Sequence, residues 1–162
     1  MNAIPTGKST VTPYVVVKDA AGFSDFVREV FGGKEEVRLP NEDGTIGHAE
    51  IRVGDAIILT FDARPEWPET PAFLSVYVED TDVVYAKALA AGAKGVTEPF
   101  TSKVTGDCMS RVADPYGNVW WIQTHLENPT QEQMNAAFAD PEERTKMVYL
   151  QNSLDKEMRS RV

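Results

Sequence analysis

The feature that most constrains this chain is a pattern of elements that occurs twice. The run Val15-Val16-Val17-Lys18-Asp19 is echoed 61 positions later by Val76-Tyr77-Val78-Glu79-Asp80. Each run favours a β-strand and closes on an aspartate that can cap a helix. Such a repeat predicts two copies of one supersecondary unit within the same protein.

The residues after each run extend the parallel. Apolar side chains at helical spacing form one stripe in each half, and each stripe stops at glycine. The stripes are Phe23, Phe26, Val27, Val30 and Phe31, then Val84, Tyr85, Ala88, Leu89 and Ala91. Short strands are predicted near 34–40, 45–53 and 56–61, and again near 95–99, 104–113 and 118–125. The order β-α-β-β-β in both halves predicts an α+β fold.

The proline-rich, polar segment DARPEWPETP separates the two halves and is typical of a linker. We therefore expect a single domain over residues 1–128. It comprises module one at 10–62, a linker at 62–71 and module two at 72–127, followed by a C-terminal helical extension at 128–162.

Two helices are predicted in this extension. Thr130 can cap the first, and Asp140-Pro141 begins the second with an N-cap and a proline at the first helical position. The second helix carries an apolar stripe of Met147, Leu150, Leu154 and Met158. This stripe must be buried, either on its own domain or across a dimer interface.

Alternation along the strands assigns the side chains to two faces. One face of the first and fifth strands is aliphatic and suits packing on helices. The other face mixes aromatic and hydroxyl side chains, which is typical of a ligand cavity. We expect Tyr14, Phe61, Phe73, Ser75, Tyr77, Arg111, Trp121 and Gln123 to bind ligand.

Composition narrows the function classes. A net charge of -9 disfavours nucleic acid as a partner, because binding a polyanion needs clustered Lys and Arg. No stretch is apolar enough to span a membrane, and no signal peptide is evident. The single cysteine, Cys108, fits a reducing compartment, so a cytoplasmic protein is expected.

Four runs in order carry a resemblance to a known family. They are VTPYVVVKDA, IGHAEIRVGDAIIL, VYVEDTDVVYAKALAAGA and RVADPYGNVWWIQTHLE. Over about residues 10–128 the chain resembles the glyoxalase/bleomycin-resistance/dioxygenase (vicinal oxygen chelate) superfamily, and its PhnB-like branch in particular. The resemblance implies two modules that form a U-shaped mixed sheet around a cavity, often within a symmetric dimer.

The resemblance also raises the question of a metal. Metal-dependent members place His, Glu or Gln at one inward position on four of the strands. The matching positions here are Thr12, roughly Leu59, Phe73 and Trp121, and none is a strong ligand. We therefore expect no metal and no cofactor, with a divalent metal at a non-standard site as the alternative.

Two polar groups on the same strand face are candidates for chemistry. His48 and Glu50 lie two residues apart, so they are neighbours that could act as an acid–base pair, although a polar strand edge is the commoner explanation. Trp121 either stacks on a ligand or fills the space of a metal. Arg111 either holds an anionic group or pairs with Glu50, and the pairing is favoured. His125 is expected to mark a strand exit, and Cys108 to be structural.

The sequence thus favours a metal-free, homodimeric small-molecule-binding protein that sequesters a toxic or aromatic compound. The alternative is a lyase or isomerase that uses a non-standard metal site or His48 and Glu50. A third hypothesis is an interaction module that acts through the C-terminal helices. No phosphate-binding loop or catalytic triad spacing favours another class.

Overall fold

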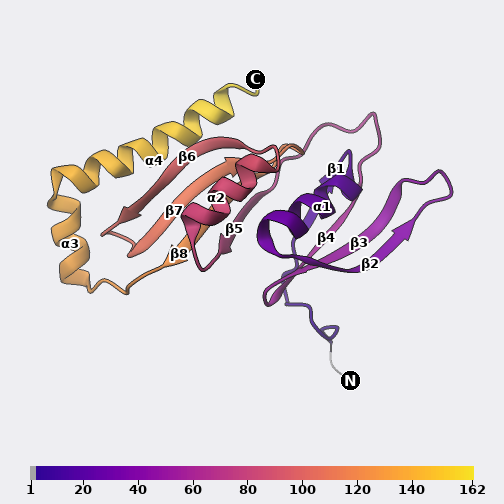
Figure 1. Ribbon diagram of the computed structural model, residues 1–162, viewed down its shortest axis with the longest axis horizontal. Coiled ribbons are helices and arrows are strands. Elements are labelled where there is room, and N and C mark those ends of the chain that lie inside the picture. Colours follow the sequence, from indigo (N-terminus) through magenta and orange to yellow (C-terminus); the bar gives the residue numbers. More distant parts are fainter. Residues whose placement is uncertain (1–2) are drawn as a thin grey trace. The chain divides into compact units, whose positions relative to one another are not determined.

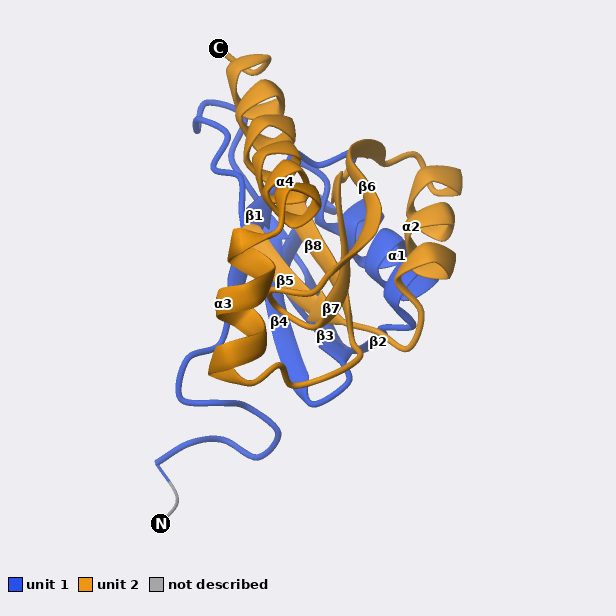
Figure 2. Ribbon diagram, turned by 90° about the vertical axis from the view of Figure 1, so that its left-hand side faces the viewer, with its two compact units in different colours: residues 1–72, 115–118 blue, residues 73–114, 119–162 orange. Residues whose placement is uncertain are grey.

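A computed structural model describes residues 3–162, which divide into two compact units (Figure 2). Unit 1 comprises Met1–Ala72 together with Pro115–Asn118, and unit 2 comprises Phe73–Asp114 together with Val119–Val162. Each unit is built around its own four-stranded sheet.

Unit 1 contains β1 (Tyr14–Val17), α1 (Ala20–Phe31), β2 (Lys34–Pro40), β3 (Ile46–Val53) and β4 (Ala56–Asp62), shown in Figure 1. The strands are ordered β1-β4-β3-β2. Strands β1 and β4 run parallel, whereas the other two pairs are antiparallel. The crossover through α1 is what allows the parallel pair.

Helix α1 buries one face of this sheet. The Asp19 side chain accepts a hydrogen bond from the Gly22 amide at the helix start, and Gly32 ends the helix in the left-handed conformation, with φ of 66°. The apolar stripe between these caps is buried except for the half-buried Phe31, with Phe23 and Val27 fully buried. Opposite them, the aliphatic side chains of β1 and β3 are buried as the alternation predicts; these are Val15, Val17, Ala49 and Ile51.

Unit 2 repeats the plan and adds two helices. It contains β5 (Phe73–Tyr77), α2 (Thr81–Ala90), β6 (Lys94–Ser102), β7 (Asp107–Ala113), β8 (Val119–His125), α3 (Gln131–Ala139) and α4 (Pro141–Arg159). The strands are ordered β5-β8-β7-β6, again with one parallel pair, β5 with β8.

The second sheet carries helices on both faces. Helix α2 packs against β6, β7 and β8, and α4 lies along β6. Figure 2 shows these two helices on opposite sides of the sheet. The apolar stripe of α4 is half-buried within unit 2, so the first of the two arrangements that the sequence allowed holds in part.

The α+β class, the two mixed sheets and the C-terminal helices are confirmed. Some strand ends differ from the prediction. The first strand begins at Tyr14, so Thr12, which was expected to lie on it, precedes its start, since Pro13 has no amide hydrogen to donate to a ladder. The seventh begins at Asp107 rather than 104, because Gly106 adopts a positive φ of 74° in a turn.

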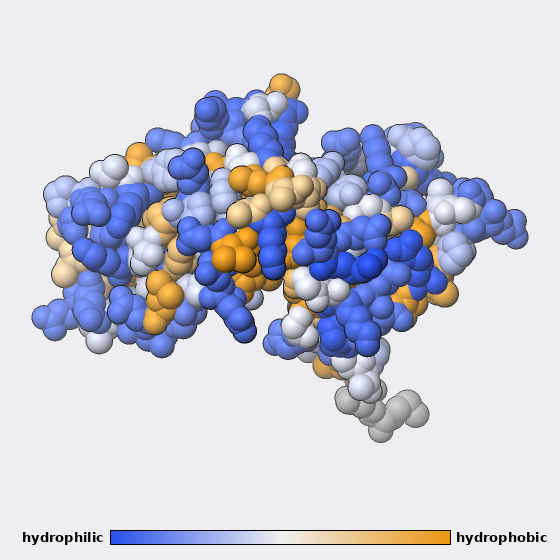
Figure 3. Space-filling view, viewed as in Figure 1, coloured by the Kyte–Doolittle hydropathy of each residue, from blue (hydrophilic) through white to orange (hydrophobic). Residues whose placement is uncertain are grey.

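Surface polarity agrees with the acidic composition. In the view of Figure 3 the apolar side chains form small patches among hydrophilic ones. Within residues 3–162, no helix is both long and apolar enough to cross a membrane.

Candidate functional site

A chain of four polar side chains lies on the face of the first sheet that α1 does not cover. Lys8 Nζ donates to Glu50 Oε1 at 2.6 Å, and the same oxygen lies 3.0 Å from His48 Nε2. On the far side of the imidazole, Nδ1 lies 3.0 Å from the Tyr14 hydroxyl. The sequence predicted the first pair, and the structure joins Tyr14 and Lys8 to it.

The charge of Glu50 fixes the direction of the hydrogen bonds among these four side chains. The hydrogen bond from Lys8, followed by that from His48, lowers the pKa of Glu50, so the carboxylate is ionised at neutral pH. An ionised carboxylate only accepts hydrogen bonds, so His48 Nε2 carries the hydrogen. In the neutral imidazole, Nδ1 is then free to accept from Tyr14. The arrangement is a relay that ends at a half-exposed tyrosine hydroxyl.

Aromatic side chains continue from Tyr14 along the same unit. The Phe61 ring meets Tyr14 edge-on at a centroid distance of 5.4 Å, and Trp67 meets Phe61 at 6.2 Å. Phe61 and Trp67 also line an open hollow of about 730 Å³ between the 41–47 and 61–67 segments. The hydroxyl end of the relay is therefore separated from this hollow by a single ring.

An open aromatic strip occupies the β5 and β8 part of the second sheet. Phe73 is 52% exposed and Tyr77 is 63% exposed, whereas Trp120, on the other face, is 2% exposed. The Trp121 ring lies 5.9 Å from Phe73. Beside them, Gln123 Nε2 donates to Ser75 Oγ at 2.6 Å. All five predicted residues of β5 and β8 thus share one face; they are Phe73, Ser75, Tyr77, Trp121 and Gln123, the open strip.

Next to the open strip, α4 covers the rest of this face. Arg111 pairs with Trp121 in the β7–β8 register, and its guanidinium carbon lies 4.2 Å from the Trp121 ring centroid. Its Nη1 donates to the Leu150 carbonyl of α4 and, at 3.4 Å, to Thr97 Oγ1. Burial lowers the pKa of Arg111 to about 10. The favoured pairing with Glu50 is not what the structure shows, since each of the two residues finds its partners within its own unit.

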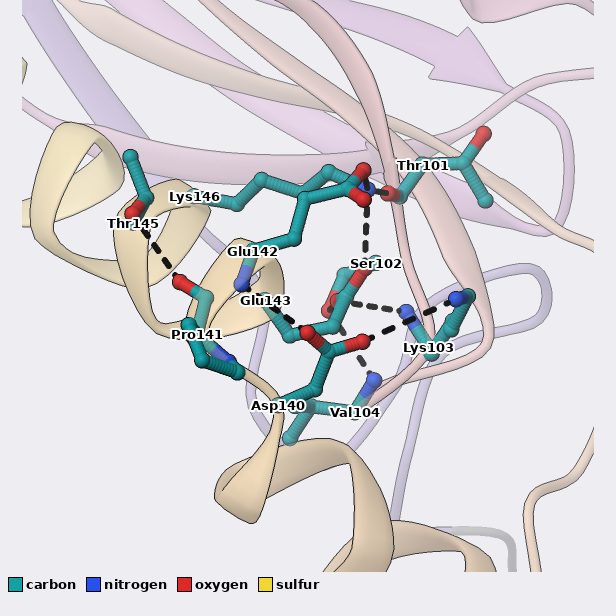
Figure 4. A network of polar contacts seen from close by, with 10 residues as sticks. All are labelled: Thr101, Ser102, Lys103, Val104, Asp140, Pro141, Glu142, Glu143, Thr145 and Lys146. Carbon is teal, nitrogen blue, oxygen red and sulfur yellow. Dashed lines mark hydrogen bonds and ion pairs between the residues drawn. The ribbon is translucent and has the colours of Figure 1, made fainter.

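Two buried glutamates hold the ends of α4 on the sheet. Glu143 is fully buried and accepts hydrogen bonds from the Lys103 amide at 2.9 Å and from Lys146 Nζ at 2.8 Å (Figure 4). At the other end, Glu157 contacts Lys94 and Arg161 at 2.7 and 3.0 Å. Burial raises the pKa of Glu157, but these two cations outweigh it and hold the pKa below its usual value. Helix α4 is therefore fastened to the sheet by charge as well as by its apolar stripe.

The residues at the positions of the family's metal ligands do not fit a metal ion. Thr12 Oγ1 donates to the Ser9 carbonyl at 3.0 Å, Leu59 has no donor atom, and the rings of Phe73 and Trp121 contact each other. A divalent site needs several convergent N or O donors. Across residues 3–162, no group of three or more His, Cys, Asp or Glu side chains has the geometry to hold a metal ion.

The two remaining candidates, His125 and Cys108, show no sign of a catalytic role. His125 is exposed at the end of β8, where its ring nitrogens meet Asp107 at 2.7 Å and Asn128 at 3.1 Å. This agrees with the expectation of a strand exit. Burial raises the pKa of the Cys108 thiol, which disfavours the thiolate that a nucleophile needs.

Four residues of these sites were not anticipated. Lys8 lies in a segment with no periodic pattern, and Glu143 and Glu157 look like ordinary solvated helix acids. Trp67 offered a signal that could have been followed, because a tryptophan within a polar, proline-rich segment needs a partner.

Comparisons with known proteins agree with this architecture. The family model described as Glyoxalase/Bleomycin resistance protein/Dioxygenase superfamily matches residues 9–122. Uncharacterized proteins of Mycobacterium bovis and Mycobacterium tuberculosis are each 29% identical over 140 residues, which covers 80% of this chain and 91% and 82% of theirs.

Solved structures show the same fold. TioX from Micromonospora sp. ML1 is 26% identical with a TM-score of 0.61, and the match covers 73% of this chain and 99% of TioX. The PhnB protein of Bacillus cereus is 15% identical with a TM-score of 0.57, and the match covers 72% of this chain and 99% of that one.

Proposed function

We propose, since the chain belongs to the Glyoxalase/Bleomycin resistance protein/Dioxygenase superfamily, that it binds and sequesters a planar aromatic small molecule without a metal ion. The observation that carries this proposal is the open strip. Large aromatic side chains stay exposed there, while the opposite face is buried on β8 and half-buried on β5.

Exposed aromatic rings on neighbouring strands favour a ligand with a flat face. Phe73 and Trp121 lie 5.9 Å apart on neighbouring strands, a spacing at which both can contact one ring system. The Ser75–Gln123 pair beside them can exchange its mutual hydrogen bond for bonds to a polar substituent. Aromatic walls with a few polar groups are the usual lining of small-molecule sites.

Calorimetric titration with a panel of two-ring and three-ring aromatic compounds tests this proposal. We expect Phe73→Ala and Tyr77→Ala to weaken binding about ten-fold each, the loss of one stacking contact. Val83→Ala and Leu89→Ala are matched controls, because these side chains are also exposed and apolar but lie on α2. Equal weakening in the controls, or binding that requires an added divalent ion after chelation, would contradict the proposal.

The relay of unit 1 favours a second candidate, an isomerase or lyase. Tyr14 would take a proton from a carbon acid while its own hydroxyl proton passes to His48 Nδ1, and Glu50 would stabilise the imidazolium that forms. The specific observation is that both imidazole nitrogens are engaged in one continuous chain with a carboxylate at one end and a phenol at the other.

Deuterium uptake from D₂O at the α-carbon of aryl ketones, followed by proton NMR, tests this second candidate. General acid–base catalysis contributes roughly 10²–10⁴-fold, so His48→Gln and Tyr14→Phe should lower the uptake rate by a factor in that range. His125→Gln is the matched control, because that histidine lies outside the relay. Uptake that is no faster than without protein, or that is unchanged in His48→Gln, would exclude this candidate for the ketones tested.

A further inference from the structure

Arg111 is a buried cation without an anionic partner. The residue is 5% exposed, and within the described part of the chain no carboxylate lies within ion-pair distance of its guanidinium. Its Nε is buried without any hydrogen-bond partner. Neutral acceptors on Leu150 and Thr97 satisfy only one of its nitrogens, Nη1.

Such an arrangement is costly unless it serves a ligand. Removing a charge from water costs several kcal/mol per ion, and a good counter-ion is the usual compensation. A guanidinium prefers to bind a carboxylate in a bidentate fork, which uses the Nε edge that is left unpaired here. If the only role of Arg111 were to hold α4 on the sheet, an uncharged side chain could donate to the Leu150 carbonyl without the cost of burying a charge.

The position of Arg111 connects it to the open strip. Its guanidinium lies over the ring of Trp121, and the Phe73 ring, from the strand on the other side of β8, lies 5.9 Å from the same ring. A flat ligand on Phe73 and Trp121 would therefore extend toward Arg111 at the border with α4. From these contacts we infer that Arg111 is the anion-binding group of the site and that the ligands are aromatic carboxylates.

This inference rests on the proposed function and adds the charge of the ligand. The ring lies on the open strip, and the carboxylate accepts hydrogen bonds from Nε and a terminal nitrogen of Arg111. Because α4 buries this edge, the helix shifts to admit the carboxylate, and the contact between Arg111 and Leu150 loosens.

A pair of matched probes tests the inference by calorimetry at neutral pH: 2-naphthoate and its uncharged analogue 2-naphthamide. We expect the intact protein to prefer the carboxylate by at least about ten-fold, as for a hydrogen bond to a charged group. Arg111→Met should remove this preference, so that 2-naphthoate and 2-naphthamide bind the variant within about three-fold of each other. Arg111→Lys should keep part of the preference, since it keeps the charge but not the fork.

The outcomes separate the two proposals. If neither probe binds, nor any other aromatic compound of the panel, the proposed function fails. If both probes bind equally, or if Arg111→Met keeps the preference, the aromatic site stands and the anion site is wrong. Should Arg111→Met not fold, the Arg111 Nε–H resonance in the intact protein decides instead. It should shift with 2-naphthoate and not with 2-naphthamide, and a resonance that responds to neither while both bind contradicts the inference.

Discussion

The two sheets share one strand order, and each packs against an equivalent helix, α1 or α2. They differ in what covers the opposite face. Within its own unit, the first sheet has only α1 against it, whereas the second has α2 on one face and α4 on part of the other. On the first sheet the ionisable groups compensate one another, as Lys8 and His48 do for Glu50. On the second, Arg111 is buried under α4 without an anion.

This difference shows how one repeated unit can support two kinds of surface. A compensated chain of polar groups can stay half-exposed at little energetic cost. A buried guanidinium beside open aromatic rings is costly without a ligand and favours binding. Helix α4 creates the second situation, because it covers Arg111 and accepts a hydrogen bond from its guanidinium at the Leu150 carbonyl.

The largest contrast between the units is in how deeply the equivalent helices are buried. Phe23 of α1 is fully buried, while Val84, its counterpart 61 positions later in α2, is only half-buried. Phe23→Ala should lower the free energy of unfolding by about 3–5 kcal/mol. Val84→Ala should lower it by only about 1 kcal/mol. Urea unfolding followed by circular dichroism measures both, and equal losses would break the comparison.

The next largest effect concerns the attachment of α4, which has no counterpart in unit 1. Glu143→Ala should destabilise unit 2 by about 3 kcal/mol, because it leaves the Lys103 amide without its acceptor and removes the shorter of the two ion pairs of Lys146. Its neighbour Glu142 is the matched control, since that side chain is 72% exposed and Glu142→Ala should cost under about 1 kcal/mol. Amide hydrogen exchange along α4 distinguishes the two variants, and similar protection in both would contradict the role given to Glu143.

The smallest effect concerns the charge compensation in unit 1. Lys8→Met should raise the pKa of Glu50, because the hydrogen bond from Lys8 is the largest cause of its lowered value. Lys18→Met is the control, since Lys18 faces the exposed Glu69 instead. Carbon-detected NMR titration of the carboxylates measures the effect of both variants. An unchanged pKa of Glu50 in Lys8→Met would show that Lys8 does not stabilise the ionised carboxylate.

The sign of the accompanying pH dependence follows from the same shift. A folded-state pKa below the unfolded one means that Glu50 stabilises the protein above its usual pKa. This contribution is lost as the pH falls through the lowered value. Lys8→Met should therefore flatten the acid limb of the stability curve.

Much of the fold was predictable from local patterns. The repeat, the Asp19 and Asp80 caps and the alternation along β1, β3 and β5 gave the element order and the faces of the strands correctly. These features depend on neighbours in sequence, which periodicity and capping describe well. The starts of β1 and β7 differ from the prediction because a proline and a glycine set them.

The sites were only partly predictable. The pairing of His48 with Glu50 follows from their spacing on one strand, and Phe73 meets Trp121 because β5 and β8 are adjacent. The contacts of Lys8 and Glu143 join residues about forty positions apart, and no local pattern encodes them. The covering of Arg111 by α4 was missed for the same reason.

The adjacent tryptophans of β8 allow the most direct test of aromatic binding on the open strip. Trp121 faces the strip, while Trp120 is buried on the other face and its Nε1 donates to Asp114 at 2.8 Å. In a titration of nitrogen-labelled protein with 2-naphthoate or 2-naphthamide, the Trp121 indole N–H signal should shift saturably and that of Trp120 should stay in place. A ligand that binds while the Trp121 signal remains unmoved would contradict a site on this face.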